Sequence, residues 1–378
     1  MENISRRRIL LSGGALLGAN ALSMLNPLSN PLFAAEVIPR PFELVRADKN
    51  ENPYGPSRVA LQAINEGMDL TNKYGGGSRR KLVELIAKQN GVTSDHVAMG
   101  TGSGEILKTG GLIASWEKGS VVCVDPTYQD LVRYASRAGT EIIRVPVDEN
   151  LACDLEAVAG AIRPDTKMVY LVNPNNPIPN IINKDALRDF VLEVSKDRLV
   201  FVDEAYYEFV ENPEYGSMID LIAEGHRNII VARTASKIPG LAVGFGFAHP
   251  DQIKQIRELR TGKNNTLGIE AAYASYQDQE FQDYTRRQNK ESLKIVEEML
   301  NELSVRYIKS NANFTFFETG VPVREINTAL LEHGIASGRP FPPFTNWSRV
   351  SMDKPEHMRY YVQTFKQLFG DRIMDSAS

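Results

Sequence analysis

The sequence has few of the residues that mark disulfide-rich, zinc-binding or nucleic-acid-binding proteins. Only two of its 378 residues are cysteines, Cys123 and Cys153, and this number is too small for a disulfide framework. Their spacing in the sequence excludes a zinc knuckle. The five histidines are scattered and form no H-x-x-x-H pair, which argues against a metal enzyme. A net charge of -4 excludes the basic excess of a nucleic-acid surface.

One short stretch near the start of the chain resembles an export signal. Residues 5–25, SRRRILLSGGALLGANALSML, begin with three arginines and continue with a mildly apolar, glycine- and alanine-rich run. The layout is that of a twin-arginine signal with cleavage near Ala34 or Ala35, and it predicts a periplasmic or otherwise exported protein. A short amphipathic or anchoring helix in a cytoplasmic protein is the alternative. The run is too short and too rich in glycine for a permanent membrane span.

Between about residues 96 and 250, short apolar runs alternate with amphipathic stretches. Runs rich in Val and Ile indicate strands that are buried on both faces, so we expect a mostly parallel sheet covered by helices, an α/β fold. Ligands of such a sheet bind beyond the carboxyl ends of its strands. The expected strands are 96–100, 120–125, 141–147, 167–172, 199–205, 228–234 and 243–249, and the expected helices are 105–116, 128–139 and 184–196.

The chain after residue 250 predicts a second, smaller α+β domain. Its pattern indicates a long helix over 279–304, strands over 305–310, 313–319 and 347–352, helices over 322–333 and 354–369, and a proline-rich loop over 338–347. The predicted organisation is an export signal (1–35), an N-terminal arm (36–60), a large domain (61–285) and a small C-terminal domain (286–378).

Polar residues stand where the predicted strands end. Asp203 closes an apolar strand, where a carboxylate is costly unless a positive group compensates it, although helix capping or an arginine partner would also explain it. Lys237 follows another strand within RTASKIPG, and the NPNNP turn contains Asn176. The glycines of GTGSGEIL, residues 100–107, open a helix whose first N–H groups could cradle a phosphate.

Each of these signals is weak alone, but together they match the needs of pyridoxal 5'-phosphate (PLP). That cofactor requires an amine for an imine bond, a carboxylate for its ring nitrogen, donors to its O3′ oxygen, a stacking aromatic and an anion site. All of these groups lie at ligand-facing ends of one predicted sheet.

The chain resembles the fold-type I, class I/II aminotransferases, and most closely the histidinol-phosphate aminotransferase branch. The similarity extends from KNENPYGPS (49–57) to SRVSMDKPEHM (348–358). The fold that it implies is a large domain with a mostly parallel seven-stranded sheet, plus a smaller α+β domain. The resemblance implies that Lys237 of TASK forms the internal aldimine with PLP.

The same resemblance assigns the other cofactor contacts and the substrate contacts. It implies that Asp203 binds the ring nitrogen, Tyr206 and Asn176 bind O3′, Tyr128 stacks on the ring, and Ser103, Gly104, Glu105 and Ser236 bind the phosphate. Tyr74 of NKYGGG resembles the tyrosine that reaches the neighbouring subunit's cofactor phosphate, which implies a homodimer. Arg349 of WSRVSM and Tyr54 of ENPYGP resemble residues that contact the substrate.

Three features depart from the family pattern. The G-L-R triplet that normally follows the lysine, whose arginine binds the cofactor phosphate, is missing between Ala242 and Val243. Arg233, Arg79 and Arg80 are the candidate replacements. The usual N-P-T-G turn is N-P-I-P, and YGGG replaces a more usual Tyr-Pro start.

Three functions remain open from the residues alone. The first is an aminotransferase that moves an amino group between a small amino compound and a 2-oxo acid. The second is a PLP-dependent lyase or decarboxylase, and the third is a non-catalytic homologue that has lost PLP. An exported protein has no obvious supply of histidinol phosphate, so we expect a different amino substrate.

Overall fold

The computed structural model describes residues 41–377, which fall in one compact unit. The predicted export signal over 1–35 lies outside the described residues. Among the described helices, none is both long enough and apolar enough to cross a membrane.

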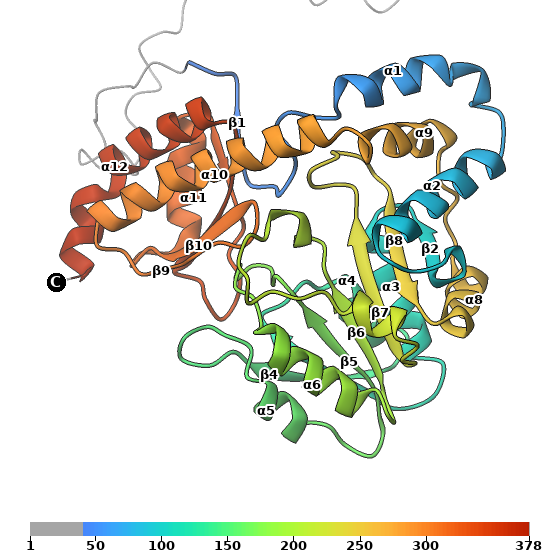
Figure 1. Cartoon of the computed structure of the whole chain (residues 1–378). Coiled ribbons are helices and arrows are strands. Elements are labelled where there is room, and N and C mark those ends of the chain that lie inside the picture. Colours follow the sequence, from blue (N-terminus) through green and yellow to red (C-terminus); the bar gives the residue numbers. More distant parts are fainter. Residues whose placement is uncertain (1–40, 378) are drawn as a thin grey trace, which may run out of the picture. The chain divides into compact units, whose positions relative to one another are not determined.

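A seven-stranded sheet carries the site (Figure 1). In spatial order its strands are β2 (Val97–Gly100), β8 (Gly244–Ala248), β7 (Ile229–Thr234), β6 (Leu199–Asp203), β5 (Thr166–Val172), β3 (Ser120–Asp125) and β4 (Glu141–Pro146). Neighbouring strands are parallel except around β8, which runs antiparallel to both β2 and β7. All seven predicted strands are therefore confirmed, with ends that differ by at most two residues.

Helices cover both faces of this sheet because its strands are apolar on both sides. Val200 and Val202 of β6 pack into one buried cluster, whereas Phe201 between them packs into the other. The helices of this part are α1 (Arg58–Glu66), α2 (Gly76–Gln89), α3 (Ser103–Ala114), α4 (Asp130–Arg137), α5 (Leu155–Gly160), α6 (Lys184–Val194), α7 (Ile219–Ala223), α8 (Pro250–Leu259) and α9 (Thr266–Ser275). The prediction found α3, α4 and α6.

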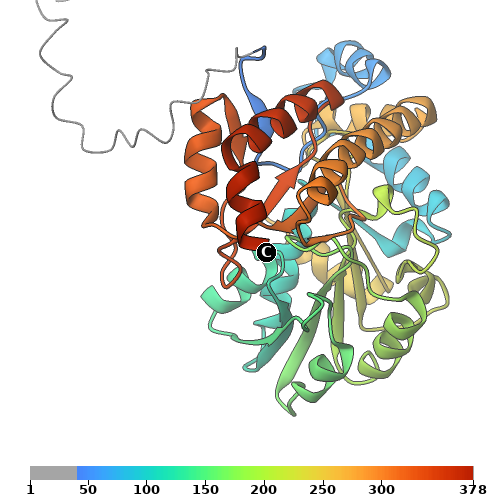
Figure 2. The same ribbon diagram turned by 90° about the vertical axis from the view of Figure 1, so that its left-hand side faces the viewer.

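The C-terminal elements gather beside the sheet in both ribbon views (Figures 1 and 2). They are α10 (Gln279–Glu302), β9 (Tyr307–Ile308), β10 (Phe314–Glu318), α11 (Val323–Glu332), β11 (Ile335–Ser337), β12 (Trp347–Ser351) and α12 (Pro355–Ala377). The arm strand β1 (Val45–Ala47) pairs in parallel with β11 and so ties the arm to this region. The predicted domain boundary after residue 285 falls inside the continuous helix α10.

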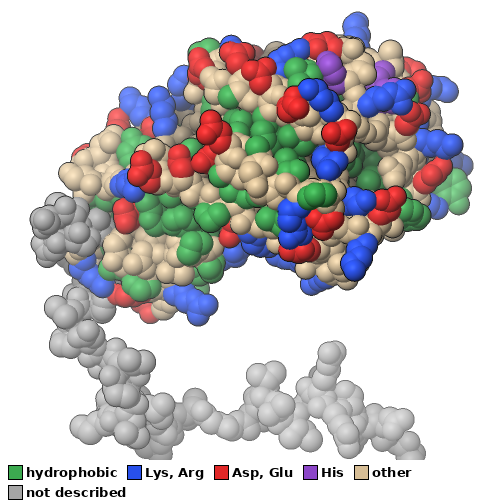
Figure 3. All heavy atoms as spheres, turned by 90° about the horizontal axis from the view of Figure 1, so that it is seen from below, with side chains coloured by type: hydrophobic (Ala, Val, Ile, Leu, Met, Phe, Trp, Pro, Cys, Tyr) green, Lys and Arg blue, Asp and Glu red, His purple; other side chains and the backbone are tan. Residues whose placement is uncertain are grey.

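Charged side chains of both signs are interspersed on the face seen in Figure 3, with apolar side chains gathered near its centre. This mixture matches the nearly balanced composition of 43 basic and 47 acidic residues.

Candidate active site

Lys237 lies in the turn that follows β7, where the apolar strand ends. Its Nζ donates a hydrogen bond to the backbone oxygen of Asn50 at 2.9 Å and lies 5.0 Å from the centre of the Tyr206 ring. The next residue, Ile238, donates its N–H to Glu208 Oε2 (3.3 Å) and accepts from Asn52 Nδ2 (2.6 Å). The turn is thus held from two sides next to the lysine.

Asp203 ends β6 and is only 2% exposed. Its Oδ1 accepts the N–H of Ala205 at 3.1 Å, and the carboxylate forms no ion pair within residues 41–377. Burial raises the pKa of this carboxyl to about 7, opposed by the Ala205 N–H and by the charge of Lys237. The positive charge of Lys237 is thus close enough to stabilise the ionised form of Asp203.

Two side-chain amides donate hydrogen bonds to the Tyr206 hydroxyl. It accepts a hydrogen bond from Asn50 Nδ2 at 2.8 Å and another from Asn176 Nδ2 at 3.1 Å. Because both contacts use the oxygen as acceptor, the hydroxyl proton is left to donate to a further group. Asn50 also accepts from Ser351 Oγ at 2.6 Å, so this residue fixes the tyrosine, the lysine and β12 together.

Arg349 of β12 extends this network from the other side. Its guanidinium donates to Asn176 Oδ1 (2.9 Å) and to the backbone oxygen of Asp48 (2.9 Å), while its buried Nε has no partner. Burial lowers the pKa of this guanidinium, and the nearby Tyr206 partly offsets that effect. Within the described chain Arg349 pairs with no carboxylate, so an anionic group would be stabilised beside it.

The helix α3 begins with Ser103, Gly104 and Glu105, the residues predicted to bind a phosphate through their backbone N–H groups. We call this first turn of α3, with Gly102 before it, the phosphate cradle. Its N-cap, Gly102, has a φ of +71°, which favours glycine, and offers no side chain to the first N–H groups. The Glu105 side chain accepts the N–H groups of Thr101 and Gly262 at 2.7 Å each, so it ties this turn to the segment before α9. These contacts hold the pKa of Glu105 below its usual range despite its burial.

Tyr128 lies in the segment after β3, where its side chain contacts Asp130. Its hydroxyl donates to Asp130 Oδ2 at 3.3 Å, and a Cβ added to Gly104 would lie 3.3 Å from the same oxygen. Burial raises the pKa of the Tyr128 hydroxyl, and the charges of Asp130 and Asp203 add to that rise. Ser236, before the lysine, accepts from Thr234 Oγ1 at 2.9 Å and keeps its own hydroxyl proton.

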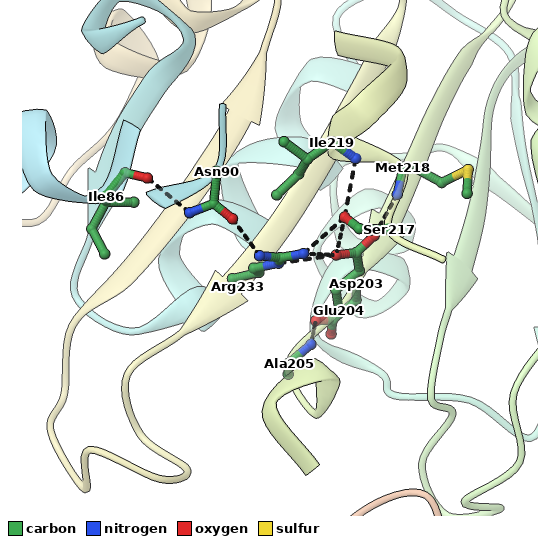
Figure 4. A network of polar contacts seen from close by, with 9 residues as sticks. All are labelled: Ile86, Asn90, Asp203, Glu204, Ala205, Ser217, Met218, Ile219 and Arg233. Atoms are coloured by element: carbon green, nitrogen blue, oxygen red, sulfur yellow. Dashed lines mark hydrogen bonds and ion pairs between the residues drawn. The ribbon is translucent and has the colours of Figure 1, made fainter. Parts of the chain in front are cut away.

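Arg233 does not replace the missing phosphate-binding arginine. It is buried and donates to Glu204 Oε2 from Nε (2.9 Å) and from a terminal nitrogen (2.7 Å), as Figure 4 shows. Its guanidinium carbon also lies 3.6 Å from the centre of the Tyr207 ring. Ser217 and Asn90 accept further hydrogen bonds from its terminal nitrogens. Four of the five guanidinium N–H groups are therefore directed at Glu204, Ser217 and Asn90 inside the protein, so Arg233 belongs to this buried network and does not take the place of the missing arginine.

Arg80 and Tyr74 are exposed side chains near the start of α2. Arg80 is exposed and lies 4.0 Å from Glu84 on α2. Tyr74 is 85% exposed, with Lys263 Nζ 5.0 Å from its ring centre, and its role toward a second subunit stays a prediction.

Tyr54 faces α10. Its hydroxyl lies 3.3 Å from Gln288 Oε1, and its ring meets Tyr284 edge to face with centroids 5.1 Å apart. Its predicted contact with the substrate therefore stays a prediction.

Asn50 is the functional residue that the sequence reasoning missed. It stands inside the quoted KNENPYGPS segment, but no strand end or charge marked it. Its contacts appear only once the arm folds across β12 and the lysine turn.

The residues fit PLP. A buried, unpaired carboxyl (Asp203), a free hydroxyl proton (Tyr206), an open helix N-terminus at Ser103 and an amine (Lys237) occur in one region, and the orphaned Nε of Arg349 borders it. When bound, PLP supplies an electron-accepting ring that stabilises a carbanion at the substrate Cα.

A family model described as "Aminotransferase class I and II" matches residues 44–365. The chain belongs to this family. It is 34% identical over 297 residues to the histidinol-phosphate aminotransferase of Moorella thermoacetica, covering 78% of this chain and 77% of the relative. It is 33% identical over 332 residues to that of Brevibacillus brevis, covering 86% and 90%. The protein is accordingly a PLP-dependent aminotransferase.

A solved structure shares this aminotransferase's fold. The histidinol-phosphate aminotransferase from Sinorhizobium meliloti in complex with pyridoxal-5'-phosphate matches with a TM-score of 0.79 and 21% identity, covering 95% of this chain and 100% of that one. At this identity the match supports the fold-type I architecture alone, and the residue roles rest on the geometry above.

Proposed function

We propose that this aminotransferase transfers an amino group between a small, acidic amino compound and a 2-oxo acid. We further propose that it works as a homodimer outside the cytoplasm after twin-arginine export. The observation that supports the acidic substrate is the guanidinium of Arg349. It is buried next to the Asn176–Tyr206 pair, pairs with no carboxylate among residues 41–377, and leaves its Nε unsatisfied.

Each residue has a role that follows from its surroundings. Arg349 would orient the substrate by its carboxylate, since a guanidinium fork binds that group bidentately. Lys237, as a free amine, would take the proton from the substrate Cα and return it to the cofactor carbon on the other side of the shared nitrogen. Asp203 would stabilise a protonated ring nitrogen, because a buried carboxylate without a cation gains most from a positive partner. Tyr206 would donate its hydroxyl proton to the ring oxygen.

A screen of amino donors with 2-oxoglutarate tests the proposed reaction. We expect glutamate to form with at least one donor that carries a carboxylate or phosphate, and we expect Arg349→Met to raise KM more than it lowers kcat. Release of pyruvate or CO₂ without glutamate would instead support the lyase or decarboxylase alternative. A decarboxylase of the same fold exists, since the L-threonine-O-3-phosphate decarboxylase of Porphyromonas gingivalis matches with a TM-score of 0.72 and 17% identity.

The relatives' name suggests histidinol phosphate as one donor to include. The proposed export argues for another donor, because an exported enzyme would be separated from cytoplasmic histidinol phosphate. Changing both Arg6 and Arg7 to Lys should block export, whereas unchanged export of that variant would contradict the twin-arginine route.

A further inference from the structure

A cavity of about 670 Å³ lies beside the loop that carries Tyr74. Five basic residues line it, and no aspartate or glutamate does: Lys73, Arg79, Arg257, Arg260 and Lys263. We call it the basic cavity. This concentration of one charge contrasts with the mixed charges on the face drawn in Figure 3 and with the overall net charge of -4.

Most of these basic groups have no acidic partner. Only Arg260 forms an ion pair within residues 41–377, at 3.3 Å from Glu105, and the Arg79 Nε is buried without any partner. The cavity also receives the start of α2 at Gly76, a helix end with no side-chain cap and no acidic residue in its first turn. Unpaired cations and open N–H groups in one hollow favour a bound anion.

The wall of the basic cavity is fastened to the phosphate cradle. Gly262 N–H donates to Glu105 at 2.7 Å, and Asn264 Nδ2 donates to the backbone oxygen of Gly100 at 2.8 Å. Lys263 stands between these two anchored residues, and Thr266 Oγ1 donates to the Lys73 oxygen at 2.9 Å. The basic residues are therefore held in place next to the first turn of α3.

The segment after Lys237, which lacks the G-L-R triplet, brings the start of β8 against the first residues of α3. β8 begins at Gly244, and a Cβ there would lie 2.1 Å from the backbone carbon of Gly102 and 2.2 Å from the Ser103 nitrogen. The backbone of β8 thus packs directly against Gly102 and Ser103 at the start of α3. No arginine or lysine stands between Lys237 and β8, so a positive charge for the phosphate would have to come from another segment.

We propose that the basic cavity binds a phosphate group. Guanidinium groups of Arg79 and Arg260 suit phosphate oxygens, and the Lys263 ammonium adds a compact charge. The phosphate is either that of PLP, in which case the cavity replaces the missing arginine, or free inorganic phosphate at a separate site. Binding of the PLP phosphate rests on the proposed function, and it also rests on the homodimer if the exposed Tyr74 and Lys263 reach a second copy. Binding of free inorganic phosphate does not rest on the proposed function.

Two charge-removing variants, Arg79→Met and Lys263→Met, test the proposal in the full-length holoenzyme. Lys81→Met is the matched control, because Lys81 is an exposed lysine of α2 that does not line the cavity. One assay measures the dissociation constant of PLP by dilution and that of pyridoxal, which lacks the phosphate. The other titrates inorganic phosphate into the holoenzyme by calorimetry. Lys263→Arg, which keeps the charge, should behave like wild type and guards against a folding artefact.

If the cavity serves PLP, both Met variants raise the PLP dissociation constant about tenfold and leave that of pyridoxal unchanged. If it serves free phosphate, wild-type holoenzyme binds inorganic phosphate and both variants lose about tenfold in that affinity, with PLP unaffected. Variants that match wild type in both assays would overturn the proposal. Wild-type protein that binds no PLP would overturn the proposed function instead, and the phosphate titration would still test the cavity.

Discussion

Asp203 and Glu204 are neighbours at the end of β6, equally buried at 2% and 1% exposure, yet their surroundings differ completely. Glu204 accepts two hydrogen bonds from Arg233, others from Ser217, and the N–H of Met218 at 2.8 Å (Figure 4). Asp203 accepts one backbone N–H and pairs with no cation among the described residues.

The difference separates a structural carboxylate from a functional one. Glu204 and Arg233 satisfy each other, so their network stabilises the fold and leaves nothing to bind a ligand. Three other residues each keep a polar group without a partner: the carboxylate of Asp203, the hydroxyl proton of Tyr206 and the Nε of Arg349. All three lie next to Lys237 or to residues that contact it. A buried polar side chain does not by itself indicate the active site, whereas a buried polar side chain that lacks a hydrogen-bond or ion-pair partner does.

Removing the amine should have the largest effect. Lys237→Ala should lower transamination by about 10⁴-fold or more, because the lysine is both the covalent anchor and the proton carrier. Initial rates with the best donor from the screen measure the loss. Lys254→Ala, at an exposed lysine of α8, is the control and should keep full activity. An active Lys237→Ala enzyme would mean that another residue carries the proton.

Neutralising the open carboxylate should affect chemistry more than folding. Asp203→Asn should lower kcat by about 10²–10³-fold, because the ring nitrogen loses its anionic partner. In PLP-free protein at about pH 4 or below, where the Asp203 carboxyl is largely protonated, the variant should unfold at a urea concentration similar to that of wild type. A variant with unchanged kcat would place the cofactor ring elsewhere.

Neutralising its neighbour should do the reverse. Glu204→Gln should lower the free energy of unfolding by about 3–5 kcal/mol, because Arg233 is left as a buried, uncompensated charge. PLP affinity per folded molecule should stay unchanged. The double variant Glu204→Leu/Arg233→Met should recover part of the stability, and the comparison fails if Glu204→Gln weakens PLP binding as much as Asp203→Asn does.

The raised pKa of Asp203 predicts a pH dependence in cofactor-free protein. Burial moves this pKa from an ordinary value of 3.8 to about 7, so between these values the folded state holds a proton that the unfolded state releases. Stability from this group is therefore lost as pH rises from about 4 to 7, by roughly 4 kcal/mol. Urea unfolding across that range should show the loss in wild type and a flatter curve in Asp203→Asn. Parallel curves for the two proteins would contradict the assignment.

Asn50→Ala should have the smallest effect. Tyr206 loses one of its two amide donors, while the backbone oxygen that holds Lys237 remains, so PLP affinity should fall about tenfold. Fluorescence titration measures it, with Asn301→Ala on the exposed side of α10 as control. Equal affinities would reduce Asn50 to a packing residue.

The sheet was predictable because its strands are continuous apolar runs, and Asp203 and Lys237 stood out because polar groups follow such runs directly. Asn50 was not predictable, because its contacts with Tyr206 and Ser351 join segments 156 and 301 residues apart in the chain. Arg233 was misjudged because the sequence gives no sign that its neighbour in space is Glu204. The basic cavity combines α2, α8 and the segment before α9, which no local pattern links.

The central claim is that Lys237 holds PLP with Asp203 at the far side of the same ring. Borohydride reduction of the purified holoenzyme, followed by peptide mass spectrometry, tests it most directly. We predict a cofactor adduct on the peptide that contains Lys237, formed in wild type and absent in Lys237→Ala. An adduct on a different lysine, or none in a protein that is saturated with PLP, would contradict the account.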